Sequence, residues 1–353
     1  MKQKICTFFT LAGLFALAVL LAPAYAADVI TAGRANEGLP FVGMAGMIVN
    51  AAALQNVFLN LKTLFNKAFE SAPSNWQKVA MLVPSTSKTN DYKWLANFPR
   101  MRKWVGEKMA KALEAFSYTV TNDDWEATVE VDRNDIEDDE LGIYAPQAQG
   151  AGFSAKQLPD EIVAELENGA FINKCYDGQY FIDTDHPVTD KDGVVQSVSN
   201  KGTKKLSAAT QAGAIASLGA ARIAMMKFKD NEGRPLNITP NVLLVPPALL
   251  DIANVLCIND RLEDGKPNPY KGCCEVVCET RLTDDNAWFL LDTTKPVKPF
   301  IYQERKKPVF VQQTDPQADD VFSRKKFKFG AEARAAGGYG FWQLAYGSDG
   351  SVA

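Results

Sequence analysis

The chain has 353 residues, of which 46% are hydrophobic and 23% are charged, an ordinary balance for a globular protein. A chain of this length can bury a sizeable core and suggests two domains, or one elaborated domain. Its net charge of −4 and its pI near 5.3 argue against general nucleic-acid binding, which usually needs a net basic face.

The first 26 residues have the pattern of a secretory signal. Lys2 and Lys4 make a charged start, and the stretch 5–22 is almost wholly apolar. A small-x-small cleavage site ends at Ala26, directly before Ala27. The apolar run is borderline in length for a membrane span, and the small residues favour cleavage. Taken alone, this leader predicts export.

A strong helix is predicted soon after the leader. Residues 27–49 are rich in glycine and alanine and aperiodic, which predicts a flexible linker. The helix is expected over 50–69, with Asn50 as its N-cap and an end near Pro73. Its apolar residues recur at i, i+3, i+4 and i+7, on one face: Leu54, Val57, Phe58, Leu61, Leu64, Phe65 and Phe69.

The segment 85–130 follows a short predicted strand over 76–83 and lacks a clean apolar period, apart from a possible helix over 103–115. Such a long excursion is unusual in a compact domain unless it has a function. Charge is split across it, with seven basic against two acidic residues over 88–111 and ten acidic against one basic over 123–140. Two interpretations stay open: a solvated surface with acids at a helix N-terminus, or complementary patches that meet between molecules.

Two helical pieces are predicted over 136–168, because glycines and Pro159 interrupt the pattern and a proline inside a helix costs about 3 kcal/mol. The second piece is expected to begin at Asp160. A loop and hairpin region follows over 171–200. A further helix is predicted over 206–226, with Ser207 as a possible cap. Its expected apolar positions are Ala214, Ile215, Leu218, Ile223 and Met226.

Strands dominate the remaining chain. They are predicted over 242–245, 288–292, 300–303, 309–312, 322–333 and 341–345, with one short helix over 249–256. The order of helices and strands lacks regular βαβ spacing. It therefore predicts an α+β fold and not a doubly wound sheet.

The string CYDGQYFIDTDHPV, residues 175–188, looks most like an active site because it contains the only histidine. Cys175 and His186 could form a nucleophile and base, with Asp183 or Asp185 to orient the imidazole. The alternative is a turn in which Asp and Thr side chains bond their own backbone and Pro187 stiffens the exit. No glycine-rich nucleophile turn accompanies the pair, so the turn is favoured and no catalytic residue is predicted.

Metal and cofactor sites are not predicted either. Calcium could be collected by a group of aspartates that lacks EF-hand spacing: Asp183, Asp185, Asp190 and Asp192. The cysteine string CCEVVC, residues 273–278, has no second pair at zinc-finger spacing, which favours reduced structural thiols. The aromatic and basic residues around Trp94 could stack on single-stranded nucleic acid, but the adjoining acidic block would repel phosphate.

Several strings along the chain carry a family resemblance. Besides 175–188 they are MIVNAAALQNVF at 47–58, APSNWQKVAMLVPS at 72–85, WLANFPRMRKWVGE at 94–107, VDRNDIEDDELGIYAP at 131–146, EGRPLNITPNVLLVPPAL at 232–249, AWFLLDTTKPVKPFIYQ at 287–303 and GFWQLAYGS at 340–348. Each alone is a weak signal, but together and in this order they are specific. They resemble the major head subunits of Mu-like phages, the T protein family.

The resemblance implies the tailed-phage capsid fold of the Hong Kong 97 type, an α+β fold. Its parts would be an N-terminal arm over 50–83, an extended loop over 84–131, a peripheral domain with a spine helix over 132–205 and 290–353, and an axial domain over 206–289. The helix over 50–69 would then be an arm that docks on a neighbouring subunit. A core helix needs the same single apolar face, so both interpretations stay open.

The resemblance also implies a function in assembly. The chain would be a major capsid protein that forms hexamers and pentamers of an icosahedral shell around packaged DNA. A scaffold protein and a head protease would be its partners during assembly in the host cytoplasm, with no cofactor and no membrane in the mature role. The expected interface residues are basic and aromatic on one patch and acidic on the other: Trp94, Phe98, Arg100, Arg102, Lys103 and Trp104, with Asp135, Glu137, Asp138 and Asp139.

The leader conflicts with this function, because a capsid subunit must assemble in the cytoplasm. One resolution is that Met47 is the natural start and that 1–46 is an upstream extension. The other is that this copy is exported. Two alternatives follow from export: an enzyme that uses Cys175 and His186, or a structural protein derived from a capsid gene.

Overall fold

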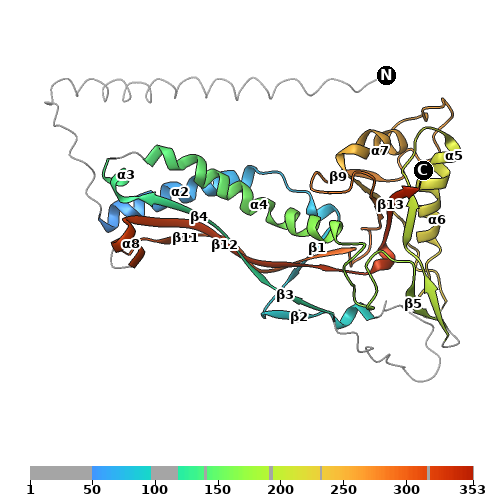
Figure 1. The fold of residues 1–353 in the computed structure, drawn as a ribbon, viewed down its shortest axis with the longest axis horizontal. Coiled ribbons are helices and arrows are strands. Elements are labelled where there is room, and N and C mark those ends of the chain that lie inside the picture. Colours follow the sequence, from blue (N-terminus) through green and yellow to red (C-terminus); the bar gives the residue numbers. More distant parts are fainter. Residues whose placement is uncertain are drawn as a thin grey trace, which may run out of the picture. The chain divides into compact units, whose positions relative to one another are not determined.

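The computed structural model describes residues 50–96, 118–138, 141–190, 194–230, 233–315 and 319–352. The chain divides into a unit over 1–48 and a unit over 49–353, and the description below concerns the second unit. This unit mixes helices with antiparallel and parallel strands (Figure 1). The α+β prediction is confirmed.

A four-stranded sheet carries the longest strands of the unit. Its order is β1 (Ala80–Pro84), β11 (Phe300–Gln313), β12 (Lys326–Tyr339) and β4 (Asp123–Asp132). β11, β12 and β4 are antiparallel neighbours, whereas β1 runs parallel to β11. The strands predicted over 300–303 and 309–312 are thus one strand that passes through Pro308. Register shifts between β11 and β12 over 304–309 surround this proline, which cannot donate to the ladder.

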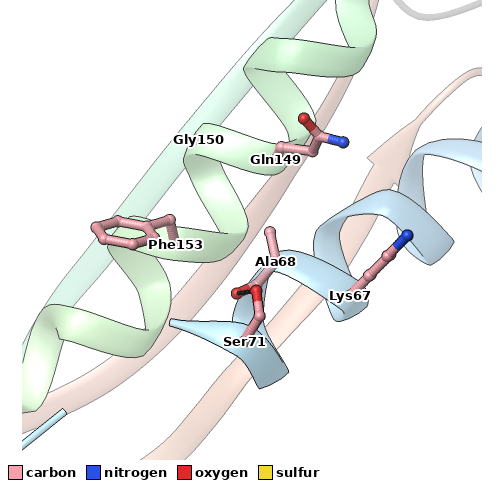
Figure 2. A pocket seen from close by; sticks show the side chains of 6 residues that line it. All are labelled: Lys67, Ala68, Ser71, Gln149, Gly150 and Phe153. Carbon is pink, nitrogen blue, oxygen red and sulfur yellow. Dashed lines mark hydrogen bonds between the residues drawn. The ribbon is translucent and has the colours of Figure 1, made fainter. Parts of the chain in front are cut away.

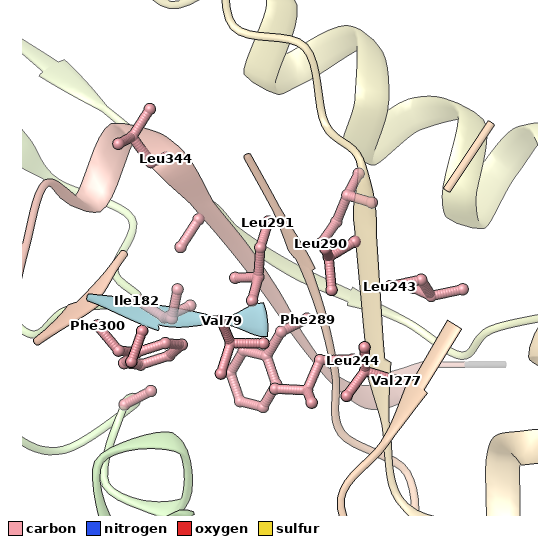
Figure 3. Close-up of a cluster of buried hydrophobic side chains, with 14 of the residues drawn as sticks. Val79, Ile182, Leu243, Leu244, Val277, Phe289, Leu290, Leu291, Phe300 and Leu344 are labelled. Atoms are coloured by element: carbon pink, nitrogen blue, oxygen red, sulfur yellow. The ribbon is translucent and has the colours of Figure 1, made fainter. Parts of the chain in front are cut away.

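A five-stranded sheet holds the larger apolar core. Its order is β7 (Lys201–Lys204), β13 (Ala345–Val352), β10 (Trp288–Leu291), β8 (Val242–Val245) and β9 (Glu275–Cys278). β8 and β10 are buried at every position, and Figure 3 shows their leucines and Phe289 packed with Phe300 and Val79. A turn of 3-10 helix (Pro247–Leu249) connects β8 to helix α7 (Leu250–Cys257). Buried strands of this kind read as continuous apolar runs, which is why sequence identified them.

Two short antiparallel pairs complete the strands that the structure describes. β2 (Thr89–Asp91) pairs with β3 (Thr119–Thr121). Residues 97–117 come between these two strands in sequence and lie outside the described residues, together with the predicted helix over 103–115. β5 (His186–Thr189) pairs with β6 (Val195–Val198), which confirms the predicted hairpin. A short helix, α8 (Asp319–Arg324), precedes β12.

Helix α2 (Ala51–Ser71) confirms the strongest prediction. Asn50 caps it, because its Oδ1 accepts a hydrogen bond from the Ala53 backbone N–H at 2.9 Å. Its apolar face packs on α4 (Ala145–Asn168) and on Phe310 of β11, with Phe58 stacked on Phe310 at 5.7 Å between ring centroids. In Figure 1 the two helices run side by side along the four-stranded sheet. The apolar face of α2 is therefore satisfied within its own chain.

Helix α4 is one continuous helix, so the prediction of two pieces is wrong. Pro159 lies inside it, and the next residue, Asp160, is buried and bound to the segment before β1. Its carboxylate accepts hydrogen bonds from Ser74 Oγ at 2.6 Å, Asn75 N at 2.7 Å and Trp76 N at 2.9 Å. Tertiary hydrogen bonds and packing of this kind offset the local cost of the proline.

Gly152 has a packing reason to be in α4. A Cβ built at this position would overlap the carbonyl oxygen of Phe65 in α2, whereas a Cβ at Gly150 would meet open space. The absence of a side chain at Gly152 lets the two helix backbones approach closely. The two glycines therefore look alike in sequence and differ in role.

We expect Gly152→Ala to destabilise the chain by about 1–3 kcal/mol, because overpacking forces α2 and α4 apart. Gly150→Ala is the matched control and should stabilise by about 0.5–1 kcal/mol, because alanine has the higher helix propensity and fills open space. Chemical unfolding of the two variants checks the sign. Equal effects of both substitutions would contradict the close approach at Gly152.

The helix predicted over 206–226 begins later and carries a different buried face. It runs through α5 (Gln211–Ala214), a π turn (Ile215–Gly219) and α6 (Ala220–Met226), and Thr210 caps it in place of Ser207. Three of its five predicted core positions, Ile215, Ile223 and Met226, are about half exposed. The core face is instead made by Ala214, Leu218, Ala221 and Met225. Because both faces of this helix carry apolar residues, the sequence pattern could not predict which face is buried.

No helix among the described residues is long and apolar enough to cross a membrane. The signal-like leader, with Ala26 and Ala27, lies outside the described residues.

Candidate functional site

The string 175–188 folds into a buried polar cluster around the histidine. His186 Nδ1 lies 2.7 Å from Asp177 Oδ2, and His186 Nε2 lies 3.2 Å from Asn200 Oδ1. The Cys175 thiol donates to Asp177 Oδ1 at 3.0 Å. The imidazole is fully buried and stacks on the Trp342 ring, with centroids 4.0 Å apart. The turn, the β5–β6 hairpin and the C-terminal strand region thus meet at one histidine.

The hydrogen bonds place an acceptor beside each ring nitrogen of this histidine. Asn200 Nδ2 donates to the carbonyl oxygens of Phe181, Trp342 and Ala345, so the Asn200 Oδ1 faces the imidazole as an acceptor. Asp177 also acts as an acceptor, from the Cys175 thiol and the Gln179 backbone N–H. The imidazole and the Asp177 carboxyl group form a buried, hydrogen-bonded pair.

The pKa values of the neighbouring groups agree with this pairing. Burial alone would raise the pKa of the Asp177 carboxyl, but hydrogen bonds from His186 and Cys175 outweigh it, and the pKa lies below its usual value. Burial, followed by the negative charge of Asp177, raises the pKa of the Cys175 thiol far above its usual value. Cys175 is therefore a thiol and not the thiolate that nucleophilic catalysis requires.

Sequence reasoning found Cys175 and His186 but chose the wrong partner. Asp183 and Asp185 do not orient the imidazole. Asp183 accepts from the backbone N–H groups of Tyr180 at 3.2 Å and Thr184 at 2.7 Å, which is the predicted turn. Asp177 takes the orienting place, because the turn at Gly178 folds it back on the hairpin. The spacing Cys-x-Asp in that turn was the available signal.

The aspartates that were considered and set aside as calcium ligands do not form a metal-binding group among the described residues, which include Asp183, Asp185 and Asp190. Asp190 binds within its own hairpin, to Val194 N at 3.0 Å and Gln196 Nε2 at 2.9 Å, and Asp192 lies outside the described residues. Within the described ranges, the ligand atoms of Cys175, Asp177 and His186 converge to within 4.8 Å of one another, as a metal site would require. These three side chains are hydrogen-bonded to each other. Those hydrogen bonds explain why the side chains lie close together, and no metal ion is needed to explain it.

Of the predicted basic and aromatic interface residues, the structure describes Trp94. It lies on a turn of 3-10 helix over Lys93–Ala96, is 37% exposed, and packs edge-on against Tyr92 and Phe341. One side of the indole therefore contacts its own core and the other faces solvent. The other members of this patch lie outside the described residues: Phe98, Arg100, Arg102, Lys103 and Trp104.

The predicted acidic residues lie on and after α3 (Arg133–Glu137), which Asp132 caps. Asp135 accepts a hydrogen bond from the Tyr144 hydroxyl, and Glu137 pairs with Arg133 at 3.0 Å. Asp138 follows the helix as its C-cap, and Asp139 lies outside the described residues. Two of these acids thus have partners within the chain.

Strand β12 supplies further partners that sequence reasoning missed. Arg334 forms an ion pair with Asp124 at 2.6 Å, and Lys326 forms one with Glu130 at 2.8 Å, across the β4–β12 ladder. Exposed pairs of this kind contribute about 0–1 kcal/mol each. Arg334 and Lys326 lie about two hundred residues after their acidic partners in the sequence. Counting charges within 123–140 therefore could not identify these ion pairs.

A hollow of about 370 Å³ lies between α2 and α4 (Figure 2). Its walls combine small, polar and aromatic side chains: Lys67, Ala68, Ser71, Gln149, Gly150 and Phe153. Among these six residues, the Ser71 hydroxyl donates to the Ala68 carbonyl oxygen at 3.1 Å. This bond lies within α2, and the hollow is an open seam between two helices.

The outer face of the helix over 211–226 is an exposed apolar surface. Its exposed residues are all apolar: Ala212, Ile215, Ala216, Ala220, Ile223 and Met226. Arg222 is the one charged residue in this stretch, and its guanidinium lies over the Tyr270 ring at 5.9 Å. A helix that is apolar on both faces is normally buried on both. This surface is therefore a candidate contact for another molecule.

Glu167, near the C-terminal end of α4, is a buried carboxyl of a different kind. It is 1% exposed, and its Oε2 has no hydrogen-bond partner among the described residues. Burial, followed by the negative charges of Glu279 and Asp160, raises its pKa well above the usual value. The folded chain thus holds a proton on Glu167 at a pH where the unfolded chain has lost it.

Because the folded chain keeps this proton, we expect its free energy of unfolding to depend on pH. Because the folded pKa is raised, the free energy of unfolding falls as pH rises from the unfolded pKa, near 4.5, toward the folded pKa. The slope from this group is about 1.4 kcal/mol per pH unit within that window. Glu167→Gln mimics the protonated acid, so its stability relative to the parent should grow as pH rises from 4 to 7. A constant difference across this range would show that Glu167 is ionised when folded.

Comparison with known proteins identifies the family. A family model described as Mu-like prophage major head subunit gpT matches residues 54–212, 204–282 and 278–353. The major capsid protein of Escherichia phage Mu is 32% identical over 306 residues, which cover 87% of this chain and 76% of that protein. The Mu-like prophage FluMu major head subunit of Haemophilus influenzae is 30% identical over 296 residues, which cover 84% of this chain and 73% of that protein.

Solved structures confirm the fold. The procapsid of bacteriophage JBD30 matches with a TM-score of 0.54 at 32% identity, over 85% of this chain and 76% of that chain. The JBD30 capsid matches with a TM-score of 0.51 at 28% identity, over 67% of this chain and 100% of that chain. The fold is the α+β capsid fold of the Hong Kong 97 type, as the sequence resemblance implied. The chain belongs to the Mu-like prophage major head subunit family.

Proposed function

We propose that this head subunit builds its shell through the apolar outer face of the helix over 211–226, packed against a second copy of the chain. The observation that carries the proposal is the composition of that face, which exposes Ile215, Ile223 and Met226 without any charged neighbour among its exposed residues before Lys227. Contiguous apolar patches on soluble proteins mark interaction sites. A shell of identical subunits supplies the partner, because every copy presents the same face.

The division into parts follows the same proposal. We assign the N-terminal arm to 50–83, the extended loop to 84–131, the peripheral domain to 132–205 and 290–353, and the axial domain to 206–289. The β2–β3 pair supports a projecting loop, because its two strands flank the stretch 97–117 in sequence. β4, at the end of the loop range, joins the four-stranded sheet and anchors the loop.

The second proposed contact is the loop patch, defined as Trp94, Phe98, Arg100, Arg102, Lys103 and Trp104. Half-exposed Trp94 supports it, since aromatic and arginine side chains supply most of the energy at protein interfaces. The acidic surface of Asp135, Glu137, Asp138 and Asp139 is its proposed complement on a neighbour. Because Asp135 and Glu137 already have partners, we infer that this pairing sets register more than affinity.

Other partners follow from the shell role. We propose assembly as hexamers and pentamers in the host cytoplasm, with a scaffold protein and a head protease, around DNA that the shell holds without sequence-specific contacts. We propose a structural role without catalysis, supported by the buried, protonated Cys175.

Electron microscopy of the chain expressed from Met47 with its scaffold tests the function and the loop patch together. The parent should form closed shells. Arg100→Glu combined with Arg102→Glu should give folded subunits and no shells, because like charges would face the acidic surface. Normal shells from the double variant would remove the loop patch from the interface. A parent that stays monomeric in the presence of its scaffold would contradict the shell role. In a separate fractionation of the full-length chain, recovery outside the cytoplasm with a cleaved leader would contradict cytoplasmic assembly.

A further inference from the structure

Three cysteines meet beside α7, away from the histidine cluster. Cys257 is the last residue of α7 and is buried, whereas Cys273 and Cys274 directly precede β9 and are partly buried. Cys273 Sγ lies 3.5 Å from Cys274 Sγ, and the Cys257 thiol interacts with both sulfurs. In sequence Cys257 stands sixteen positions before Cys273, so only the fold shows the group.

The backbone holds the two sides of this group together. The Gly272 N–H donates to the carbonyl oxygen of Cys257 at 2.6 Å, and the Cys273 N–H donates to Tyr270 O at 3.0 Å. Gly272 has a φ of 69°, a conformation that glycine adopts without strain. The chain thus returns to the end of α7 one residue before Cys273, and a bond between the sulfurs of Cys257 and Cys273 needs no long-range movement.

The surroundings of Cys273 favour its thiolate. Hydrogen bonds from Cys257 and Cys274 lower the pKa of Cys273 far below its usual value, and the Arg222 guanidinium lowers it further. The same hydrogen bonds raise the pKa of Cys257, which stays a thiol. Arg222 Nε is buried without a hydrogen-bond partner among the described residues, so its charge has no competing partner at that atom.

We propose that Cys273 is a reactive thiolate that exchanges with low-molecular-weight disulfides, and that Cys257 resolves the product into an intrachain Cys257–Cys273 disulfide. Cys257 is the resolving thiol and Cys274 is not. Adjacent residues have Cα atoms about 3.8 Å apart, closer than the roughly 4.4–6.8 Å that disulfides usually span. The site is a modification site and does not depend on the shell contacts.

The chemistry balances with oxidised glutathione as the disulfide. The Cys273 thiolate attacks one glutathione sulfur, the S–S bond of glutathione breaks, and one glutathione thiolate leaves. The released glutathione thiolate takes the proton of the Cys257 thiol, the Cys257 thiolate attacks the Cys273 sulfur of the mixed disulfide, and a second glutathione thiolate leaves. The Cys257 proton ends on a glutathione thiolate. Two cysteines are oxidised to one disulfide while one glutathione disulfide is reduced to two thiols.

The test treats the full-length, unassembled chain with oxidised glutathione at neutral pH and maps the products by mass spectrometry without reduction. The parent should contain a Cys257–Cys273 disulfide. Cys257→Ser should stop at the mixed disulfide, seen as one glutathionyl group on Cys273. Cys273→Ser should lose both products. Cys278→Ser is the matched control, because Cys278 lies on the same segment, and it should react as the parent does.

Two outcomes would overturn the proposal. One is a Cys257→Ser chain without glutathione on Cys273. The other is a Cys273→Ser chain that still forms a disulfide to Cys257, which would make Cys274 the attacking thiol. Circular dichroism establishes that each variant is folded. Cys257→Ala replaces Cys257→Ser if the buried serine prevents folding, and the same mixed disulfide is then expected.

Discussion

Ile215→Glu combined with Ile223→Glu should leave the subunit folded and abolish shell formation. Both side chains are about half exposed, and glutamate is a good helix former, so the monomer should change in stability by no more than about 1 kcal/mol. Burying an isoleucine side chain contributes about 1.5–3 kcal/mol. About half of each side chain is already buried in the subunit, so losing both should weaken a pairwise contact by about 10–100-fold. Light scattering against protein concentration measures the assembly threshold.

Two controls separate the apolar face from general effects of charge or side-chain shape. Ile215→Leu combined with Ile223→Leu keeps the face apolar and should still form shells. Lys227→Glu places a negative charge on the same helix just beyond the face, and should also permit assembly. If the glutamate variant forms shells at the parent's concentration, the 211–226 face is not a subunit contact. If Lys227→Glu fails equally, long-range charge repulsion and not burial controls assembly.

Asp177→Asn should destabilise the chain by about 3–5 kcal/mol at neutral pH. The substitution keeps the shape of the side chain but removes the carboxylate that faces His186 Nδ1, and removing one partner of a buried pair is costly. Chemical unfolding followed by tryptophan fluorescence is a direct measurement, because Trp342 stacks on His186. Asp185→Asn is the control, since Asp185 is exposed in the same turn and should change stability by no more than about 0.5 kcal/mol.

The destabilisation caused by Asp177→Asn should become smaller as pH falls. The folded pKa of Asp177 lies below its usual value of 3.8, so its contribution is fully present above about pH 4 and is lost as pH falls through the folded pKa. The gap between parent and Asp177→Asn should therefore narrow in acid. A gap under about 1 kcal/mol at neutral pH would contradict a stabilising role of the buried pair.

The histidine cluster shows which parts of a site the local sequence can predict and which parts it cannot. The pattern CYDGQYFIDTDHPV predicted a turn and a hairpin, because aspartate, glycine and proline act on their own backbone. It did not identify Asp177 as the partner or Asn200 and Trp342 as neighbours. These contacts join positions up to 156 residues apart, from His186 to Trp342, and they depend on which strands the chain brings together.

The glycines and Pro159 of α4 show the opposite error. Read locally, they predicted a broken helix, and the structure contains one continuous helix. Asp160 holds the segment before β1, and Gly152 admits the backbone of α2 at close range. Residues that weaken an isolated helix can thus be required by its neighbour, a fact that propensity in one segment does not contain.

The sequence by itself determined the capped helix α2, the buried strands β8 and β10, the α+β class and the family, because these depend on apolar period, capping chemistry and strings that stand in a fixed order. Tertiary structure alone decided which side of the 211–226 helix is buried, which bases pair with Asp124 and Glu130 of β4, and that Cys257 meets Cys273. The physical reason is that burial, ion pairing and thiol contact are set by distances between segments, and a linear pattern carries no such distances.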